Sequence, residues 1–176
     1  MALEEPGKVE QIMETPTLRY NGVFDFSGLY RMMYNWFFKQ RYEFHEDLYK
    51  EKIDTIGNEL EIKWRAEKKI TSFVKYIVNV EFHLWNMVEV DVIKNGQKVK
   101  MTKARMQIIM KASTVADYAQ RFKESNLTRK LYHILRTKVI DKEMMLVYMD
   151  RLTYIVYEFH AEIKKFLGTD TSSNAY

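Results

Sequence analysis

The sequence predicts an α+β fold: an antiparallel sheet of about five strands packed against a long C-terminal helix. Three observations support this. Apolar and polar residues alternate with period two from residue 42 to residue 113, and turn residues interrupt them at Gly57-Asn58 and Asn95-Gly96. One strand and one helix precede that four-strand meander. After Ser113 the apolar spacing becomes helical. A chain of 176 residues is long enough for one domain with a real core.

The ends of the chain lack periodicity. Residues 1–16 are polar and contain both prolines, so we expect a flexible N-terminal lead-in. Residues 17–168 form the single predicted domain, and residues 169–176 are a polar tail.

The first elements of the predicted domain are a strand and a helix. Thr17 to Phe24 reads as a strand, and Asp25 or Ser27 can cap a helix from Gly28 to about Arg41. The apolar residues of this helix recur at helical spacing and are expected in the core: Leu29, Met32, Met33, Trp36 and Phe37.

Two shorter strands follow. The strand at residues 42–53 places Tyr42, Phe44 and Leu48 on one side. Residues 59–70 alternate almost without fault, which is typical of a half-buried antiparallel strand. The predicted buried side of that strand is Leu60, Ile62, Trp64, Ala66 and Ile70.

A long hairpin completes the meander. Its first arm runs from Phe73 to Ile93, Asn95-Gly96 supplies a type I′ turn, and the second arm returns to Ser113. Apolar residues change parity on the return arm, so we place a bulge near Thr102-Lys103, which would set His83 opposite Ile109 and Trp85 opposite Gln107. The predicted inner face of the first arm is interrupted only by Asn86 and comprises Val74, Tyr76, Val78, Val80, Phe82, Leu84, Val88, Val90 and Val92.

The C-terminal part is predicted to be helical. Residues 114–123 are ambiguous, and Ser125 or Asn126 can cap a helix to about Lys138. Asp141 caps the final helix, Lys142 to Leu167, which Gly168 closes. At 1.5 Å per residue this helix would be roughly 39 Å long and would cross the sheet.

This element order is loosely similar to the helix-grip or START-like plan, in which a curved sheet wraps a C-terminal helix. The pattern Tyr42-Glu-Phe-His-Glu46, Tyr49-Lys-Glu-Lys52, Gly57-Asn-Glu-Leu-Glu-Ile-Lys-Trp64, Asn95-Gly96 and Ala116-Asp-Tyr118 resembles uncharacterised proteins of small-genome archaea. That resemblance implies an archaeal origin and carries no assigned activity. With no signal peptide and no apolar run of membrane-spanning length, it favours a cytoplasmic protein.

No catalytic pattern is present in the sequence. There is no cysteine, no phosphate-binding glycine loop and no nucleophile elbow. The four histidines are scattered; His45 and Asp47 could share a metal, but a solvated strand face explains them better. We therefore expect a non-enzymatic protein without metal or cofactor.

Positive charge concentrates on the hairpin. The chain carries a formal net charge of +4, and no Asp or Glu lies between Val92 and Ala116. These cations could bind phosphates of RNA or of a nucleoprotein, or could instead protect a strand edge from aggregation. The candidate nucleic-acid-binding residues are Lys94, Lys98, Lys100, Lys103 and Arg105.

A second candidate surface is the outer face of the hairpin. Apolar and aromatic side chains there require either a covering helix or a partner. They are Phe73, Ile77, His83, Trp85, Met87 and Ile109.

The sequence leaves three functions open. The first is a binding or accessory module that contacts nucleic acid through the hairpin. The second is a small-molecule or lipid carrier with a pocket between sheet and final helix, lined by Met145, Met149, Leu152, Trp64 and Phe82. The third is a protein-interaction or homodimer module that uses the Trp85 face.

Overall fold

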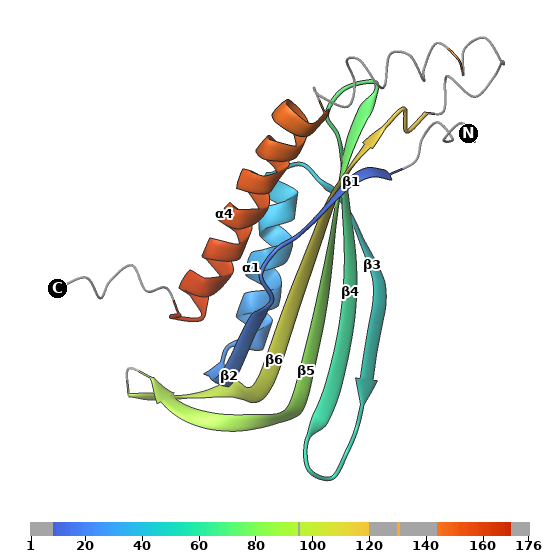
Figure 1. Cartoon of the computed structure of the whole chain (residues 1–176). Helices are drawn as coiled ribbons and strands as arrows, with labels where there is room; N and C mark the ends of the chain where they lie inside the picture. Colours follow the sequence, from blue (N-terminus) through green and yellow to red (C-terminus); the bar gives the residue numbers. More distant parts are fainter. Residues whose placement is uncertain (1–8, 95, 120–129, 131–143, 170–176) are drawn as a thin grey trace.

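The computed structural model describes residues 9–94, 96–119, 130 and 144–169, and these form an antiparallel sheet with helices on one face (Figure 1). The predicted α+β class is confirmed. The elements in chain order are β1 (Val9–Glu14), β2 (Leu18–Phe24), α1 (Phe26–Lys39), β3 (Glu43–Lys52), β4 (Asn58–Lys69), β5 (Val74–Lys94), β6 (Gln97–Ala116), η3 (Met144–Met149) and α4 (Asp150–Phe166).

Strand β6 organises the sheet because three strands pair with it. The strand order is β1–β6–β5–β4–β3, and β2 also pairs with β6. β1 lies beside residues 111–115 of β6 and β2 beside residues 102–108, so the two short strands follow one another along the same edge. Pro16 separates them, and proline cannot donate to a sheet ladder. The prediction of a flexible lead-in over residues 1–16 is therefore wrong for Val9–Glu14, which pairs with β6, and residues 1–8 lie outside the described residues.

Helix α1 begins at Phe26, two residues before the predicted start at Gly28. The Asp25 side chain caps it by accepting a hydrogen bond from the Gly28 N–H at 2.8 Å, so Asp25 and not Ser27 is the cap. Leu29, Met33 and Phe37 are fully buried against the sheet. The helix ends before Arg41, which has a positive φ of 60°.

The β3–β4 pair differs from the prediction at one position. β4 buries Leu60, Ile62, Trp64 and Ala66, as its alternation predicts. In β3 the register shifts between Glu46 and Leu48, so Leu48 pairs with the outward-facing Lys63. Leu48 is therefore not on the side of Phe44, because a bulge at Asp47 reverses the parity of the strand.

The hairpin bulge lies on the opposite arm from the predicted one. Trp85 pairs with Arg105 and Val88 with Lys103, so the extra residue belongs to β5, not to Thr102-Lys103 of β6. Asn86 absorbs the bulge with a φ of 52°, in the left-handed region that asparagine tolerates. Placing the bulge in β5 shifts the pairing by two residues: His83 opposes Gln107, and Trp85 does not oppose it.

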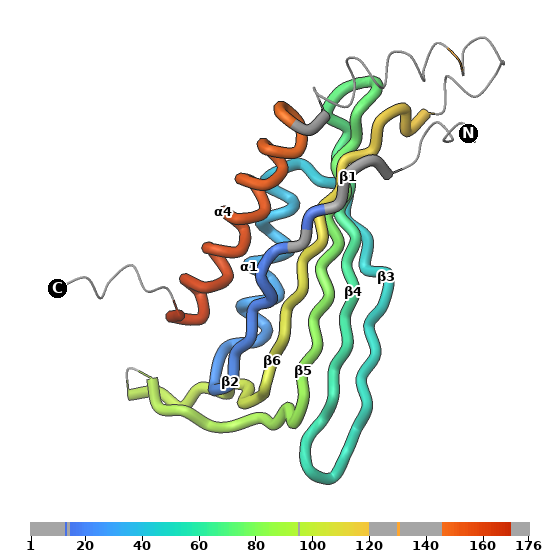
Figure 2. The backbone as a smooth tube through the Cα atoms, in the orientation of Figure 1, coloured from blue at the N-terminus to red at the C-terminus, as the bar shows by residue number. Residues whose placement is uncertain are grey.

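Beyond the bulge the hairpin leaves the core. Figures 1 and 2 show β5 and β6 turning sharply at their lower ends and continuing as a projecting ribbon. Val88, Val90 and Val92 pair with odd-numbered residues of β6, which share the face of Arg105. These valines are therefore not on the inner face with Leu84, as the uninterrupted alternation suggested.

The C-terminal helix is shorter than predicted and is irregular at its start. A π-helical segment, Met144–Met149, leads into the 17-residue α-helix Asp150–Phe166. Gly168 follows with a φ of 66°, as expected for a helix end. Asp141 and the predicted helix from Ser125 to Lys138 lie outside the described residues. No described helix has the length and apolar character required to cross a bilayer.

Aromatic side chains fill the space between the sheet and the helices. Phe159 of α4 contacts Phe37 of α1 with ring centroids 4.8 Å apart, and Trp64 contacts Phe82 at 4.7 Å. Leu152, Trp64 and Phe82 are at most 1% exposed. Three of the residues expected to line a carrier pocket are thus part of the packed core, while the side chain of Met145 lies outside the described residues.

Candidate nucleic-acid interface

The outer sheet face, opposite the helices, carries a row of polar and aromatic residues from three strands. Arg19 of β2 pairs with Gln107 of β6, which pairs with His83 of β5. The adjacent row joins Asn21, Arg105 and Trp85 in the same order. Because β6 is regular between residues 102 and 108, alternate residues of the three strands project on one side.

Trp85 is the centre of a stacked group on this face. The imidazole of His83, two residues away on the same strand, lies 3.9 Å from it between ring centroids, with the planes inclined by 24°. The guanidinium of Arg105 lies over the indole at 4.7 Å, a cation–π contact. His83 Nε2 is 2.6 Å from a Glu59 carboxylate oxygen, which fixes the ring. The result is a set of flat groups held in place before any ligand arrives.

A recess of about 510 Å³ opens beside this stack, and we call it the Trp85 recess. Its volume falls in the range that small ligands or single nucleotide units occupy. The lining comes from three neighbouring strands: Arg19, Tyr20, Asn21, Trp85, Arg105, Met106 and Gln107.

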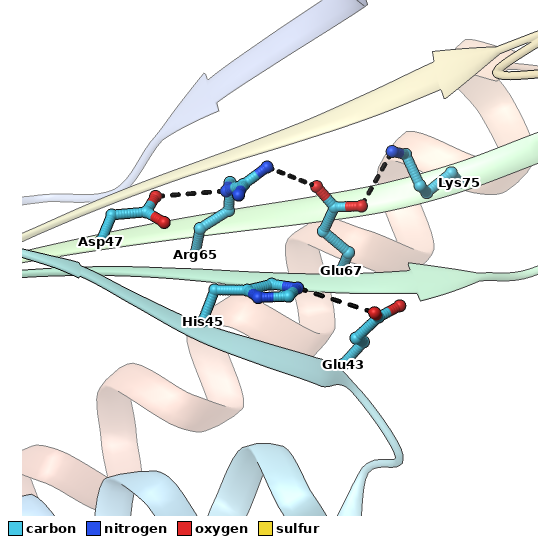
Figure 3. Close-up of polar contacts among 6 residues, drawn as sticks. All are labelled: Glu43, His45, Asp47, Arg65, Glu67 and Lys75. Carbon is cyan, nitrogen blue, oxygen red and sulfur yellow. Dashed lines mark hydrogen bonds and ion pairs between the residues drawn. The ribbon is translucent and has the colours of Figure 1, made fainter.

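Charge is divided unevenly across the outer face. β2 and β6 contain no Asp or Glu, so Arg19, Lys103 and Arg105 have no carboxylate on their own strands. On β3, β4 and the start of β5, six charged or titratable residues instead form ion pairs with one another: Glu43, His45, Asp47, Arg65, Glu67 and Lys75 (Figure 3). The β2–β6 side of the face is therefore positive.

The paired half explains two residues that the sequence considered for a metal. His45 Nε2 lies 3.7 Å from Glu43, and Asp47 accepts from the Arg65 guanidinium at 3.2 Å. Glu67 bridges Arg65 and Lys75, and its hydrogen bond from Lys75 holds the pKa of the Glu67 carboxyl below its usual range. Among the described residues no group of three or more His, Asp or Glu side chains could hold a metal ion.

The predicted cationic residues of the hairpin fall into two groups. Lys98 pairs with Asp91 and Lys100 with Glu89, each at 2.9 Å, on the ribbon face that continues the inner side of the sheet. Lys94 and Lys103 lie on the other ribbon face and form no ion pair within the described part of the chain. The acid-free segment from residue 92 to residue 116 does not include Glu89 and Asp91, because both precede it in the sequence. In the folded hairpin they nevertheless pair with lysines of that segment.

The predicted partner surface is also divided. Ile77, His83, Trp85 and Ile109 are half-buried on the outer face, as expected. Phe73 and Met87 pack instead against the edge of the core. α1 covers the inner face, so the first helix is not the covering element, and the other helix considered, from Ser125 to Lys138, lies outside the described residues.

Sequence reasoning missed Arg19 and Asn21. They become neighbours of Trp85 only because β2 pairs with β6, and that long-range pairing leaves no local signal in the sequence. The only signal in the sequence was that Arg19 and Asn21 lie two positions apart on a predicted strand, so that both side chains project on the same side.

A second recess lies between α1 and β3, and we call it the Tyr30 recess. Its volume is about 460 Å³. Near it, Glu46 accepts hydrogen bonds from the Tyr30 hydroxyl at 2.5 Å and from the buried Trp64 Nε1 at 3.1 Å. Burial and the neighbouring Glu46 raise the pKa of Tyr30. The lining residues are Phe26, Ser27, Tyr30, Arg31, Tyr34 and Tyr49.

Comparison with protein-family models, with curated proteins and with solved structures finds no match for this chain. The functional argument therefore depends on the geometry of the outer face.

Proposed function

We propose that the protein is a non-enzymatic module that binds single-stranded nucleic acid on the β2–β6–β5 part of its outer sheet face. The observation that carries this proposal is the His83–Trp85–Arg105 stack beside the Trp85 recess, next to β2 and β6, the two strands that carry no carboxylate. Flat aromatic and guanidinium groups on a sheet stack unpaired bases.

The cations supply the second requirement. Arg19, Arg105 and Lys103 can each contact a phosphate, which releases counterions and favours binding at low salt. Asn21 and Gln107 present amide donors and acceptors at the same recess, and such groups can hydrogen-bond the edges of a splayed base. A duplex hides those base edges and base faces, so single strands are the expected class of ligand.

The test is fluorescence anisotropy with labelled single-stranded RNA, single-stranded DNA and a duplex, at two salt concentrations. We expect the single strands to bind in a salt-sensitive manner and to bind more tightly than the duplex. Arg19→Gln/Arg105→Gln should weaken it strongly, and Trp85→Ala should weaken it by about 1–3 kcal/mol through lost stacking.

The matched control is Lys50→Gln/Lys63→Gln, which removes the same charge from β3 and β4. If this control weakens binding as much as the arginine variant, attraction is only a property of net charge and the proposal fails. Absence of binding at low salt also overturns it.

A further inference from the structure

The projecting part of the β5–β6 hairpin has two faces with different chemistry. Pairing places Val90 opposite Met101 and Val92 opposite Val99 on one face. The other face holds the ion pairs of Glu89 with Lys100 and of Asp91 with Lys98. The first face is mainly apolar and the second mainly charged, although Ile93, 80% exposed, also lies on the second face beside Lys98. We call the first side of the hairpin its valine face, which comprises Val88, Val90, Val92, Val99 and Met101 with Lys94, Gln97 and Lys103.

The valine face points away from the core. β6 is regular, so Lys103 and Met101 share the face of Arg105, whereas Thr102 pairs with the buried Phe24 on the core side. Val88 is 38% exposed and Val99 is 40% exposed. An amphipathic strand pair normally turns its apolar side inward, so this reversed orientation calls for a partner.

Charge decides which partner fits. The charged residues on the valine face are Lys94 and Lys103, and both hairpin carboxylates lie on the other side. A second copy packed face to face would bring lysines together. Nucleic acid would find no aromatic ring on this face on which to stack a base. An anionic lipid surface offers both an apolar layer and phosphates at its boundary.

We propose that the valine face docks on an anionic lipid bilayer. The valines and Met101 enter the boundary between headgroups and acyl chains, and Lys94 and Lys103 contact lipid phosphates. The contact is peripheral: the ribbon lies in the interface and does not span it.

The experiment is co-flotation of the full chain with vesicles of phosphatidylcholine alone and of phosphatidylcholine with phosphatidylglycerol. We expect binding to the anionic vesicles only. Val90→Thr/Val92→Thr/Val99→Thr keeps side-chain shape and strand propensity, and should weaken partitioning by at least about tenfold. Lys94→Gln/Lys103→Gln should weaken it about 25-fold, at about fivefold per lysine.

Lys50→Gln/Lys63→Gln again serves as the charge-matched control and should bind vesicles like the unaltered chain. Circular dichroism and thermal midpoints verify that every variant is folded. No binding to anionic vesicles, or equal binding by the triple threonine variant, overturns the proposal.

Sedimentation velocity tests the alternative that a second copy of the chain, and not lipid, occupies the valine face. A dimer that the threonine substitutions dissociate would assign the valine face to a second copy and overturn lipid docking. The two proposals share Lys103, but their failures are distinguishable: nucleic-acid binding is measured by anisotropy without lipid, and its other residues, Arg19, Trp85 and Arg105, are not altered in the vesicle experiment.

Discussion

Asn86 decides where the hairpin leaves the sheet. Its positive φ lets β5 carry one extra residue, and the backbone of the neighbouring β3–β4 turn lies against it: a Cβ on Gly57 would come within 2.9 Å of the Asn86 Cα. We expect Asn86→Val to lower the free energy of unfolding by about 1–3 kcal/mol, because a β-branched residue is strained at that φ. Asn86→Gly should be nearly neutral. Urea denaturation checks both, and equal losses would contradict the conformational explanation.

Glu46 accepts two hydrogen bonds, from the Tyr30 hydroxyl and from the Trp64 indole. It accepts the N–H of Trp64, a side chain only 1% exposed, so removing the acceptor leaves a buried donor unpaired. Glu46→Ala should cost about 1–3 kcal/mol of stability, and Glu46→Gln, which keeps an acceptor oxygen, should cost less. Chemical denaturation of the two variants measures the difference. Similar losses would show that the carboxylate charge, and not the acceptor, matters.

At the scale of elements, His160 links α4 to the junction of β1 and β2. It is 6% exposed, and burial, followed by the nearby Lys164, lowers the pKa of His160 below its ordinary value of 6.5, although a hydrogen bond with the Pro16 backbone opposes the shift. The unfolded chain therefore binds the proton more tightly. The free energy of unfolding should therefore show no loss from His160 above about pH 6.5. It should fall as the pH drops through that value and below it, because the unfolded chain takes up the proton first.

Thermal unfolding between pH 7 and pH 5 tests this, with His160→Gln as the comparison. The variant should lose less stability over the same interval. If both proteins respond equally to pH, another group is responsible.

Elements with a strong local pattern could be predicted from the sequence, and elements defined by distant pairing could not. The alternation of β4 and the cap of α1 both belong to short segments: the alternation is confirmed, and Asp25 is one of the two caps that the sequence allowed. Placing the bulge required knowing which strand carries the extra residue, and parity alone fits either arm. Trp85 was identified from the sequence, but its neighbours Arg19 and Asn21 were not. They approach Trp85 only through the β2–β6 pairing, which joins segments far apart in the sequence.

At the scale of the whole molecule, the uneven charge of the outer face predicts how salt acts on binding. Each phosphate contact to a single strand contributes about −0.7 to the slope of log K against log salt, so three cations give a slope near −2. Lys103→Gln should reduce that slope by about 0.7, whereas Lys100→Gln, whose lysine already pairs with Glu89, should change it less. Anisotropy titrations at several salt concentrations measure both. Equal changes would contradict the assignment of the two ribbon faces.

The position of β6 also has a consequence for how the chain folds. β2 pairs with β6, and Leu18 pairs with Ile108, so the hydrogen bonds between these strands cannot form before residue 108 has been synthesised. During synthesis the N-terminal strands and the apolar side of α1 therefore emerge long before their partner strand exists. Sheets with such distant contacts fold slowly, because a long loop must be closed before the contact stabilises it. A nascent chain of this protein should thus depend on chaperones until β6 has left the ribosome.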